Sequence, residues 1–148
     1  MAASNLNFAA QVDAWCRKSE ARLLTVFRES TQRTVSIAQE NLRTVVNVQT
    51  GFLRASVRAS TERMPTIDSG AYPVPGKSYA YSGDEIVLVI AGAQLGQTIF
   101  IGWTAAYSGF IEFGTTRMAP RAYARLAALQ WQTTVSSVIA EAKSRTLQ

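Results

Sequence analysis

The first third of the chain has a pattern that allows few folds. From about Phe8 to Val48 the chain contains neither proline nor glycine, and its apolar residues recur at spacings close to three and four. Because an α-helix completes one turn in 3.6 residues, this spacing places the apolar side chains on one face. The pattern predicts one long amphipathic helix over the span. Its apolar positions are Phe8, Val12, Trp15, Leu23, Phe27, Ala38, Leu42, Val45 and Val46.

The length of this predicted helix has a consequence for assembly. Charged residues of both signs fall mostly between the apolar positions, as on a solvated helix face. A polar section at 30–36 could bend the helix, and the alternative is that the span breaks into two helices that fold back on each other. A continuous helix would be longer than a small domain can cover. Part of it is then expected to contact a neighbouring chain.

Residues 64–83 are predicted to form a loop, since proline and glycine are too dense there for a helix or a strand. An irregular segment of about twenty residues is uncommon in a compact domain and is usually functional or disordered. Three tyrosines in the segment favour contact with a partner, because amphipathic rings are common at protein interfaces. They are Tyr72, Tyr79 and Tyr81. The alternative is a solvated, flexible loop.

Two apolar segments follow, and both are rich in β-branched residues. Residues 85–91 and 98–103 are joined by a turn that contains two glycines. This arrangement predicts an antiparallel β-hairpin over about 85–103. Both faces of its first strand are apolar, so both are expected to be covered. A third strand is expected at 57–62.

The chain ends in a second amphipathic pattern. From Pro120 to about Arg145, apolar residues step by three and four along one stripe, which predicts a helix. Its polar flank is uncharged, which fits a subunit contact better than a free surface. The patterns together predict a single α+β domain over 1–148, with a long N-terminal helix, a small antiparallel sheet, and a C-terminal helix packed on that sheet.

The segment from Tyr107 to Tyr123 joins the predicted sheet to this last helix. Its first half is aromatic and apolar around one carboxylate, Glu112. Gly114 ends that pattern, and we expect a positive φ angle there because glycine enters the left-handed region without strain. Pro120 stands where the next helix is expected to begin, at a first-turn position that needs no N–H donor. The segment is therefore predicted to be a turn between two packed elements.

Three arginines leave this turn at spacings of four. Arg117, Arg121 and Arg125 would lie on one side of a helix, with no acidic residue between them. Together with the loop tyrosines they are our candidate interface residues. The arginines would contact another protein subunit or DNA, and the tyrosines a protein partner. A solvated face, or pairing with Glu112 inside the subunit, are the alternatives.

Composition excludes most kinds of catalytic site. The chain of 148 residues has no histidine and a single cysteine, Cys16. Internal disulfides, the usual zinc clusters and the Ser-His or Cys-His nucleophile pairs are therefore absent. A lone Glu112, without a nucleophile, a base or a metal ligand, does not make an active site. We predict no catalytic, cofactor-binding or metal-binding residues and no enzymatic activity.

The net charge of +5 comes from twelve arginines and three lysines against ten acidic residues. A basic balance can indicate nucleic-acid binding through neutralisation of phosphates. Here the basic residues are mostly dispersed, which favours solubility and surface ion pairs. No apolar run reaches the roughly 18–20 residues that cross a bilayer, and the N-terminus lacks the features of a signal peptide. We expect a protein made in the cytoplasm, without a membrane partner.

Two short blocks of the sequence resemble a known family. One is Thr50-Gly-Phe-Leu-Arg-Ala-Ser56, and the other runs from Tyr107 through Phe110-Ile-Glu-Phe-Gly-Thr115 to Met118-Ala-Pro-Arg-Ala122. Together they are similar to the signature of the small neck and tail-completion proteins at the head–tail junction of long-tailed bacteriophages. The chain departs from that family at Val48-Gln49, where a proline is common, and in the long segment 64–83. The matching positions are Thr50, Gly51, Leu53, Arg54, Ser56, Tyr107, Glu112, Phe113, Gly114, Thr115 and Pro120.

The resemblance implies a structural virion protein and not an enzyme. Such a protein forms an oligomeric ring, joins the DNA-filled head to the tail and continues the DNA channel, either as the neck ring or as the tail terminator. The implied partners are further copies of the chain, a head-closure or adaptor protein, a tail-terminator or tail-tube protein, and DNA crossing the lumen without sequence specificity. Its place would be the head–tail connector of the virion, after virus assembly in the host cytoplasm. The alternative is a small cytoplasmic nucleic-acid-binding module that uses a basic surface.

Overall fold

A single helix sets the length of the molecule. In the computed structural model, which describes residues 2–45 and 49–147, helix α1 (Ala2–Val45) runs without a break. The long helix predicted from the apolar spacing is confirmed, and over this described span the chain does not fold back on itself. The predicted last turn, with Val46 and Val48, lies outside the described residues.

The polar section at 30–36 stays helical because its hydroxyl groups bond to the helix backbone. Thr31 donates to the carbonyl of Phe27 at 2.8 Å, and Thr34 donates to the carbonyl of Ser30 at 2.9 Å. Such bonds satisfy a hydroxyl group without ending a helix. Helix α1 therefore continues through this section.

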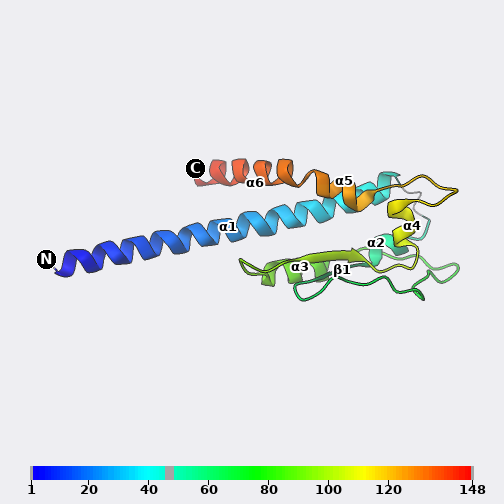
Figure 1. Cartoon of the computed structure of the whole chain (residues 1–148), viewed down its shortest axis with the longest axis horizontal. Helices are drawn as coiled ribbons and strands as arrows, with labels where there is room; N and C mark the ends of the chain where they lie inside the picture. Colours follow the sequence, from blue (N-terminus) through cyan, green and yellow to red (C-terminus); the bar gives the residue numbers. More distant parts are fainter. Residues whose placement is uncertain (1, 46–48, 148) are drawn as a thin grey trace.

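The described residues after α1 form seven short elements (Figure 1). They are α2 (Phe52–Ala55), β1 (Val57–Ser60), α3 (Asp84–Gly92), β2 (Phe100–Trp103), α4 (Ser108–Phe113), α5 (Tyr123–Leu129) and α6 (Trp131–Thr146). Strands β1 and β2 form an antiparallel sheet, in which Val57 pairs with Trp103 and Ser60 pairs with Phe100. The molecule is of the α+β class, as predicted, with the C-terminal helices packed against the sheet.

One predicted strand is a helix. The hairpin expected over 85–103 is wrong, because its first half forms α3, and β2 pairs instead with the segment predicted as a third strand. In α3 the buried residues are Ile86 and Ile90, four apart, whereas Leu88 is 73% exposed. A strand would have placed these three side chains on one face. Two acidic residues in the first turn also suit the positive end of a helix dipole. In this segment the burial of Ile86 and Ile90 on one face of a helix outweighs the β-propensity of its residues.

The C-terminal helix also differs from its prediction. It is two helices that meet at Gln130, and it begins at Tyr123 instead of Pro120. The residues just after the proline stay outside the helix because the N–H groups of Arg121 and Ala122 donate to carbonyls of α4, at 2.9 and 3.1 Å. Ala122 has a φ of 48°, a left-handed conformation that separates the turn from α5.

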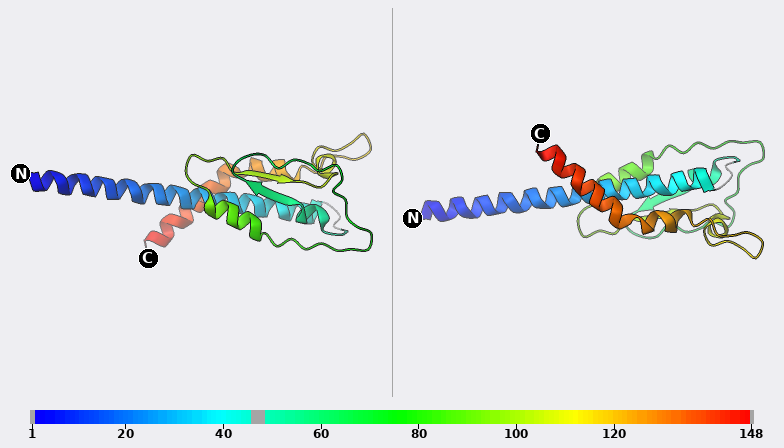
Figure 2. Two further views of the ribbon diagram at one scale, coloured as in Figure 1. Left: turned by 90° about the horizontal axis from the view of Figure 1, so that it is seen from below. Right: turned by 90° about the horizontal axis from the view of Figure 1, so that it is seen from above.

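Helix α1 lies in the middle of the molecule, with α5 and α6 along one side and α3 and the sheet on the other (Figure 1). Helix α6 crosses α1 at an angle (Figure 2). The core forms where α1, the sheet, α3 and α5 meet, and α1 contributes to it from its C-terminal half only. The buried core residues are Val35, Ala38, Leu42, Leu53, Val57, Ile86, Ile90, Trp103, Ala105, Tyr123 and Ala127.

The chain between β1 and α3 is irregular, as predicted for residues 64–83. It is nevertheless tied to the domain by backbone hydrogen bonds. The N–H of Asp68 donates to the carbonyl of Thr104 at 2.9 Å, and the N–H of Ala106 donates to the carbonyl of Ala71 at 3.0 Å. These bonds hold the first part of the loop beside the end of β2.

Candidate functional site

The two sequence blocks that carry the family resemblance meet in space. The rings of Phe52, from the first block, and Tyr107, from the second, have centroids 6.4 Å apart. The backbone N–H and the hydroxyl of Thr104 both donate to the carbonyl of Ser56, at 3.1 and 3.0 Å. The Ser56 hydroxyl in turn donates to the carbonyl of Leu53 at 2.7 Å. The blocks therefore build one corner of the fold, at the end where α2 and α4 lie (Figure 1).

The Thr50-Gly51 pair is where the loop closes on this corner. Gly51 has a φ of 78°, and a Cβ atom there would lie 2.3 Å from the carbonyl oxygen of Tyr79. The N–H of Tyr79 donates to the carbonyl of Thr50 at 2.7 Å. Only glycine fits both this conformation and this close approach. Arg54 packs nearby, with its guanidinium 5.9 Å from the centroid of the Tyr81 ring.

Glu112 connects the second block to the start of α5. The residue is 6% exposed, and its carboxylate accepts hydrogen bonds from the N–H groups of Ala124 and Arg125, at 2.9 and 3.0 Å. The Arg125 side-chain Nε donates to the same carboxylate at 2.9 Å. Because N–H groups in the first turn of a helix have no partner within it, Glu112 caps α5. The expected alternative that Glu112 pairs with an arginine inside the subunit is confirmed.

Burial around Glu112 also affects a neighbouring tyrosine. Tyr123, the first residue of α5, is buried, and its hydroxyl donates to the carbonyl of Ser108 at 3.4 Å. Burial, and then the negative charge of Glu112, raise the pKa of the Tyr123 hydroxyl well above its usual range. The tyrosine therefore stays neutral and serves as a packing and hydrogen-bonding group.

Gly114 has the positive φ angle that the sequence predicts. Its φ and ψ are 78° and 178°, a combination that side-chain-bearing residues rarely adopt. An added Cβ atom would lie 2.7 Å from the nitrogen of Pro120 and 2.8 Å from the carbonyl oxygen of Met118. The N–H of Thr115 donates to that same Met118 carbonyl at 2.9 Å. The turn after α4 is therefore closed on itself.

The expected row of arginines is not formed. Arg117 lies in the turn and Arg121 precedes α5, so only Arg125 is on the helix. Arg125 is held by Glu112 and lies over the ring of Phe113, 4.8 Å from its centroid. The prediction of one helical face is wrong, because the turn continues up to the start of α5. An interface role for the exposed Arg117 and Arg121 stays a prediction.

The three loop tyrosines differ in how much of the ring is free. Tyr79 packs edge-on against Phe52, with ring centroids 4.9 Å apart. Tyr81 packs against the core, and this burial raises the pKa of its hydroxyl. Tyr72 is 60% exposed and lies 6.4 Å from the ring of Tyr107. Tyr72 is thus the most available of the three, and contact of this loop with a partner stays a prediction.

One exposed surface was not among the predicted sites, and it lies at the opposite end of the molecule. The N-terminal half of α1 runs beyond the other described elements (Figures 1 and 2), and residues 7–18 are all exposed. Its apolar face is bare, since Phe8 and Trp15 are each 69% exposed and Leu23 is 61% exposed. We call Phe8, Val12, Trp15 and Leu23 the projecting stripe. The sequence showed these residues only as part of the long apolar pattern of the predicted helix.

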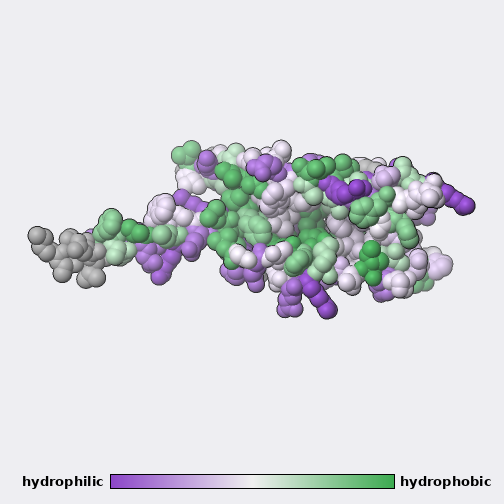
Figure 3. All heavy atoms as spheres, viewed as in Figure 1, coloured by the Kyte–Doolittle hydropathy of each residue, from purple (hydrophilic) through white to green (hydrophobic). Residues whose placement is uncertain are grey.

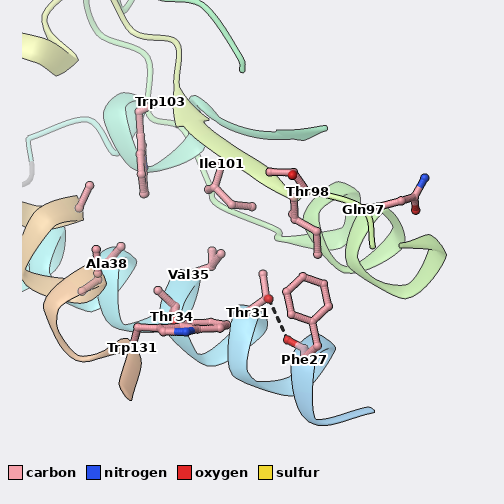
Figure 4. A pocket seen from close by; sticks show the side chains of 14 residues that line it. Phe27, Thr31, Thr34, Val35, Ala38, Gln97, Thr98, Ile101, Trp103 and Trp131 are labelled. Carbon is pink, nitrogen blue, oxygen red and sulfur yellow. Dashed lines mark hydrogen bonds between the residues drawn. The ribbon is translucent and has the colours of Figure 1, made fainter. Parts of the chain in front are cut away.

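An apolar groove of about 490 Å³ opens between α1, β2 and α5 (Figure 4). Val35 on α1 faces Ile101 and Trp103 on β2, and Trp131 at the start of α6 lies at the side. None of the residues that line this α1–β2 groove is charged. Hydrophobic residues are visible on the projecting part of α1 and over the middle of the molecule in Figure 3. The described surface therefore carries two separate apolar features.

Ion pairs fasten α6 to α1. Arg33 donates to Glu141 at 2.8 Å and to Glu29 at 2.9 Å, and Arg145 donates to Glu29 at 3.0 Å. The hydrogen bond and charge of Arg33 lower the pKa of the Glu141 carboxyl. Exposed pairs of this kind each contribute little free energy, so the network orients α6 more than it stabilises it.

Neither a cluster of metal-ligating residues nor a helix able to span a membrane is found in the part of the chain that the structure describes. No group of three or more His, Cys, Asp or Glu side chains among residues 2–45 and 49–147 could hold a metal ion. Nor does any described helix combine the length and hydropathy needed to cross a bilayer.

Comparison with known proteins gives no match. No protein-family model, no curated protein and no solved structure matches the chain. The family resemblance therefore rests on the two sequence blocks, and the function has to be argued from the surfaces described above.

Proposed function

We propose that this chain is a structural protein of the bacteriophage neck, which forms an oligomeric ring at the head–tail junction. The ring would join the DNA-filled head to the tail and continue the DNA channel. The observation that carries this proposal is the projecting stripe, a row of large apolar side chains that their own chain leaves bare. A soluble monomer seldom keeps such a surface uncovered, so it marks a contact with another protein.

The total surface area supports assembly. The chain exposes 10031 Å², whereas a compact monomer of 16.1 kDa exposes about 7,400 Å² on the usual scaling of area with mass. The excess of about 2,600 Å² is well above the roughly 800 Å² that each partner contributes to a standard interface. A chain of this shape has much of its surface available for burial in an assembly.

The two blocks that resemble the neck and tail-completion family support assembly at the phage neck in particular. Phe52 and Tyr107, one from each block, lie together, and Glu112 and Gly114 fix the turn into α5. The two blocks therefore have a common structural role in this chain. The proposed partners follow from the family: further copies, a head-closure or adaptor protein, and a tail-terminator or tail-tube protein.

Charge is compatible with DNA in the lumen of the ring. A net charge of +5 favours contact with phosphates and carries no sequence readout. A dedicated nucleic-acid-binding module is less well supported, because the arginine row that would form its basic face is interrupted at the start of α5. We therefore keep protein–protein recognition as the main activity.

The proposal is tested in the phage that encodes the chain. Disrupting the gene should give filled heads and full-length tails that stay separate, and a plasmid copy should restore joined particles. A plasmid with Phe8→Ser and Trp15→Ser should not restore them, because both anchors of the projecting stripe are lost while helix propensity hardly changes. Arg17→Ser on the opposite face of α1 is the matched control and should restore joining.

Two results would contradict the proposal. Joined particles in the absence of the gene would show that the chain is not needed at the junction. A purified protein that binds DNA with a steep salt dependence, and that is missing from finished particles, would favour the nucleic-acid-binding alternative.

A further inference from the structure

We propose that the projecting stripe of one copy docks in the α1–β2 groove of the next copy, so that one repeated contact builds the ring. This inference rests on the proposed function and names the two surfaces through which the copies join. The occupant of the groove is a second copy of this chain.

The chemistry of the two surfaces matches. The stripe presents aromatic and aliphatic side chains, and the groove is lined without charge. The hydroxyls of Thr31 and Thr34, which line the groove, already donate to carbonyls of their own helix. Small polar ligands are usually oriented by a few converging polar groups, whereas most residues that line this groove are apolar. Apolar protein side chains fit it better.

The contact has to form between chains. Phe27 lines the groove, and twelve residues of continuous helix, about 18 Å, separate it from Trp15. The stripe cannot fold back onto the groove of its own chain. Contact between two different patches on identical subunits is heterologous, and it forms a ring when the rotation from one copy to the next closes.

The use of both apolar features favours this contact over a pairing of two stripes. In a heterologous ring each copy takes part in two interfaces, once through its stripe and once through its groove. A pairing of stripe with stripe would use one interface, stop at a dimer and leave the groove open.

Cys16 allows a direct test on the purified full-length protein. It is exposed on the projecting half of α1, and Thr98 lies on the exposed rim of the groove. In the variant Thr98→Cys, oxidation should link Cys16 of one copy to position 98 of the next, giving a ladder of dimers, trimers and larger species. The same two positions within one chain are too far apart for a disulfide, which needs Cα atoms within about 7 Å.

Matched variants make the test decisive. Ser69→Cys places a thiol on the exposed loop outside the groove and should give no ladder. Adding Trp15→Ser to Thr98→Cys should abolish the ladder, and Gln97→Cys on the same rim replaces Thr98→Cys if that variant does not fold. Peptide mapping should identify the linkage between positions 16 and 98.

Several results would overturn the inference. They are efficient formation of wild-type dimers linked through Cys16, a ladder that survives Trp15→Ser, and cross-linking no stronger than that of Ser69→Cys. These results leave the proposed function standing if disruption of the gene still separates heads from tails. In that case a different protein of the neck, and not a second copy of this chain, would be the one that covers the stripe.

Discussion

The two halves of α1 have the same apolar periodicity and opposite surroundings. In the covered half, residues 27–42, Val35, Ala38 and Leu42 are buried by the sheet, α3 and α5. In the projecting half, residues 7–23, the stripe faces solvent. The comparison teaches that an amphipathic pattern shows which face of a helix will be covered. It does not show whether the cover belongs to the same chain.

The two halves also differ in what keeps them helical. Helices in water are marginal on their own, and most of their stability in proteins comes from packing of the apolar face. The covered half has that packing within the subunit. The projecting half has an exposed ion pair, Arg17 with Asp13, which contributes little. Its stability should therefore depend on assembly.

The largest expected effect comes from matched truncations in the two halves. Leu42→Ala removes a side chain that is 1% exposed, and should lower the free energy of unfolding by about 2–5 kcal/mol. Leu23→Ala in the projecting half should change the unfolding of a dilute monomer by less than about 0.5 kcal/mol. Urea titration measures both, and sedimentation should show that Leu23→Ala weakens association. Equal losses of stability in the two variants would contradict the difference between the halves.

A second prediction concerns the turn at Gly114, which positions α5 on the covered half of α1. Gly114→Val should cost about 1–3 kcal/mol, because valine is strained at a φ of 78° and its Cβ would meet Pro120. The strained turn would misplace α5, which packs on α1. Gly92→Ala is the control, since nothing lies within 4 Å of an added Cβ there. Thermal unfolding compares the two, and wild-type melting of Gly114→Val would show that the turn does not position α5.

A third prediction concerns the cap of α5. Glu112→Ala should cost about 1–2 kcal/mol, because two N–H groups of the first turn lose their acceptor. Arg125→Met leaves both N–H donors of the cap in place and removes only side-chain contacts of Arg125, so it should cost less than Glu112→Ala. Chemical denaturation of both variants measures the difference. A larger loss in Arg125→Met would mean that the ion pair, and not the cap, holds α5.

The smallest effect is expected from pH. Arg33 holds the pKa of the Glu141 carboxyl below its ordinary value, which is about 4.3. A lowered pKa in the folded state adds stability above the ordinary value, and this is lost as pH falls below it. The melting temperatures of wild type and Glu141→Gln should therefore differ slightly at pH 7 and converge towards pH 3. A difference that stays constant over this range would show that the pair does not fasten α6 to α1.

Local patterns predicted the parts of the fold that depend on local physics. The spacing in α1, the positive φ of Gly114 and the pairing of Glu112 follow from helix geometry, glycine sterics and the need of a buried charge for partners. The segment at 85–91 was ambiguous. Ile86 and Ile90 share a face both in a strand, where Leu88 joins them, and in a helix, where it does not. Packing against α1 and β1 settled this in favour of α3.

Tertiary contacts decided what the local patterns left open. The arginine row failed because backbone hydrogen bonds to α4 hold the residues after Pro120 outside α5. The α1–β2 groove combines residues that are distant in the sequence, so no motif marked it. The sequence showed the projecting stripe only as part of a long apolar pattern, since periodicity is the same with and without a partner.

Hydrogen exchange along α1 is the most direct test of the account, because it measures the two halves of one helix in a single experiment. It should be recorded for the dilute monomer and for the protein at a concentration where sedimentation shows an assembly. Amides at 30–42 should be protected in both samples, whereas amides at 9–23 should exchange rapidly in the monomer and become protected on assembly. If 9–23 exchange alike in both samples, or no assembly forms while the monomer already protects them, the projecting half of α1 is not an assembly surface.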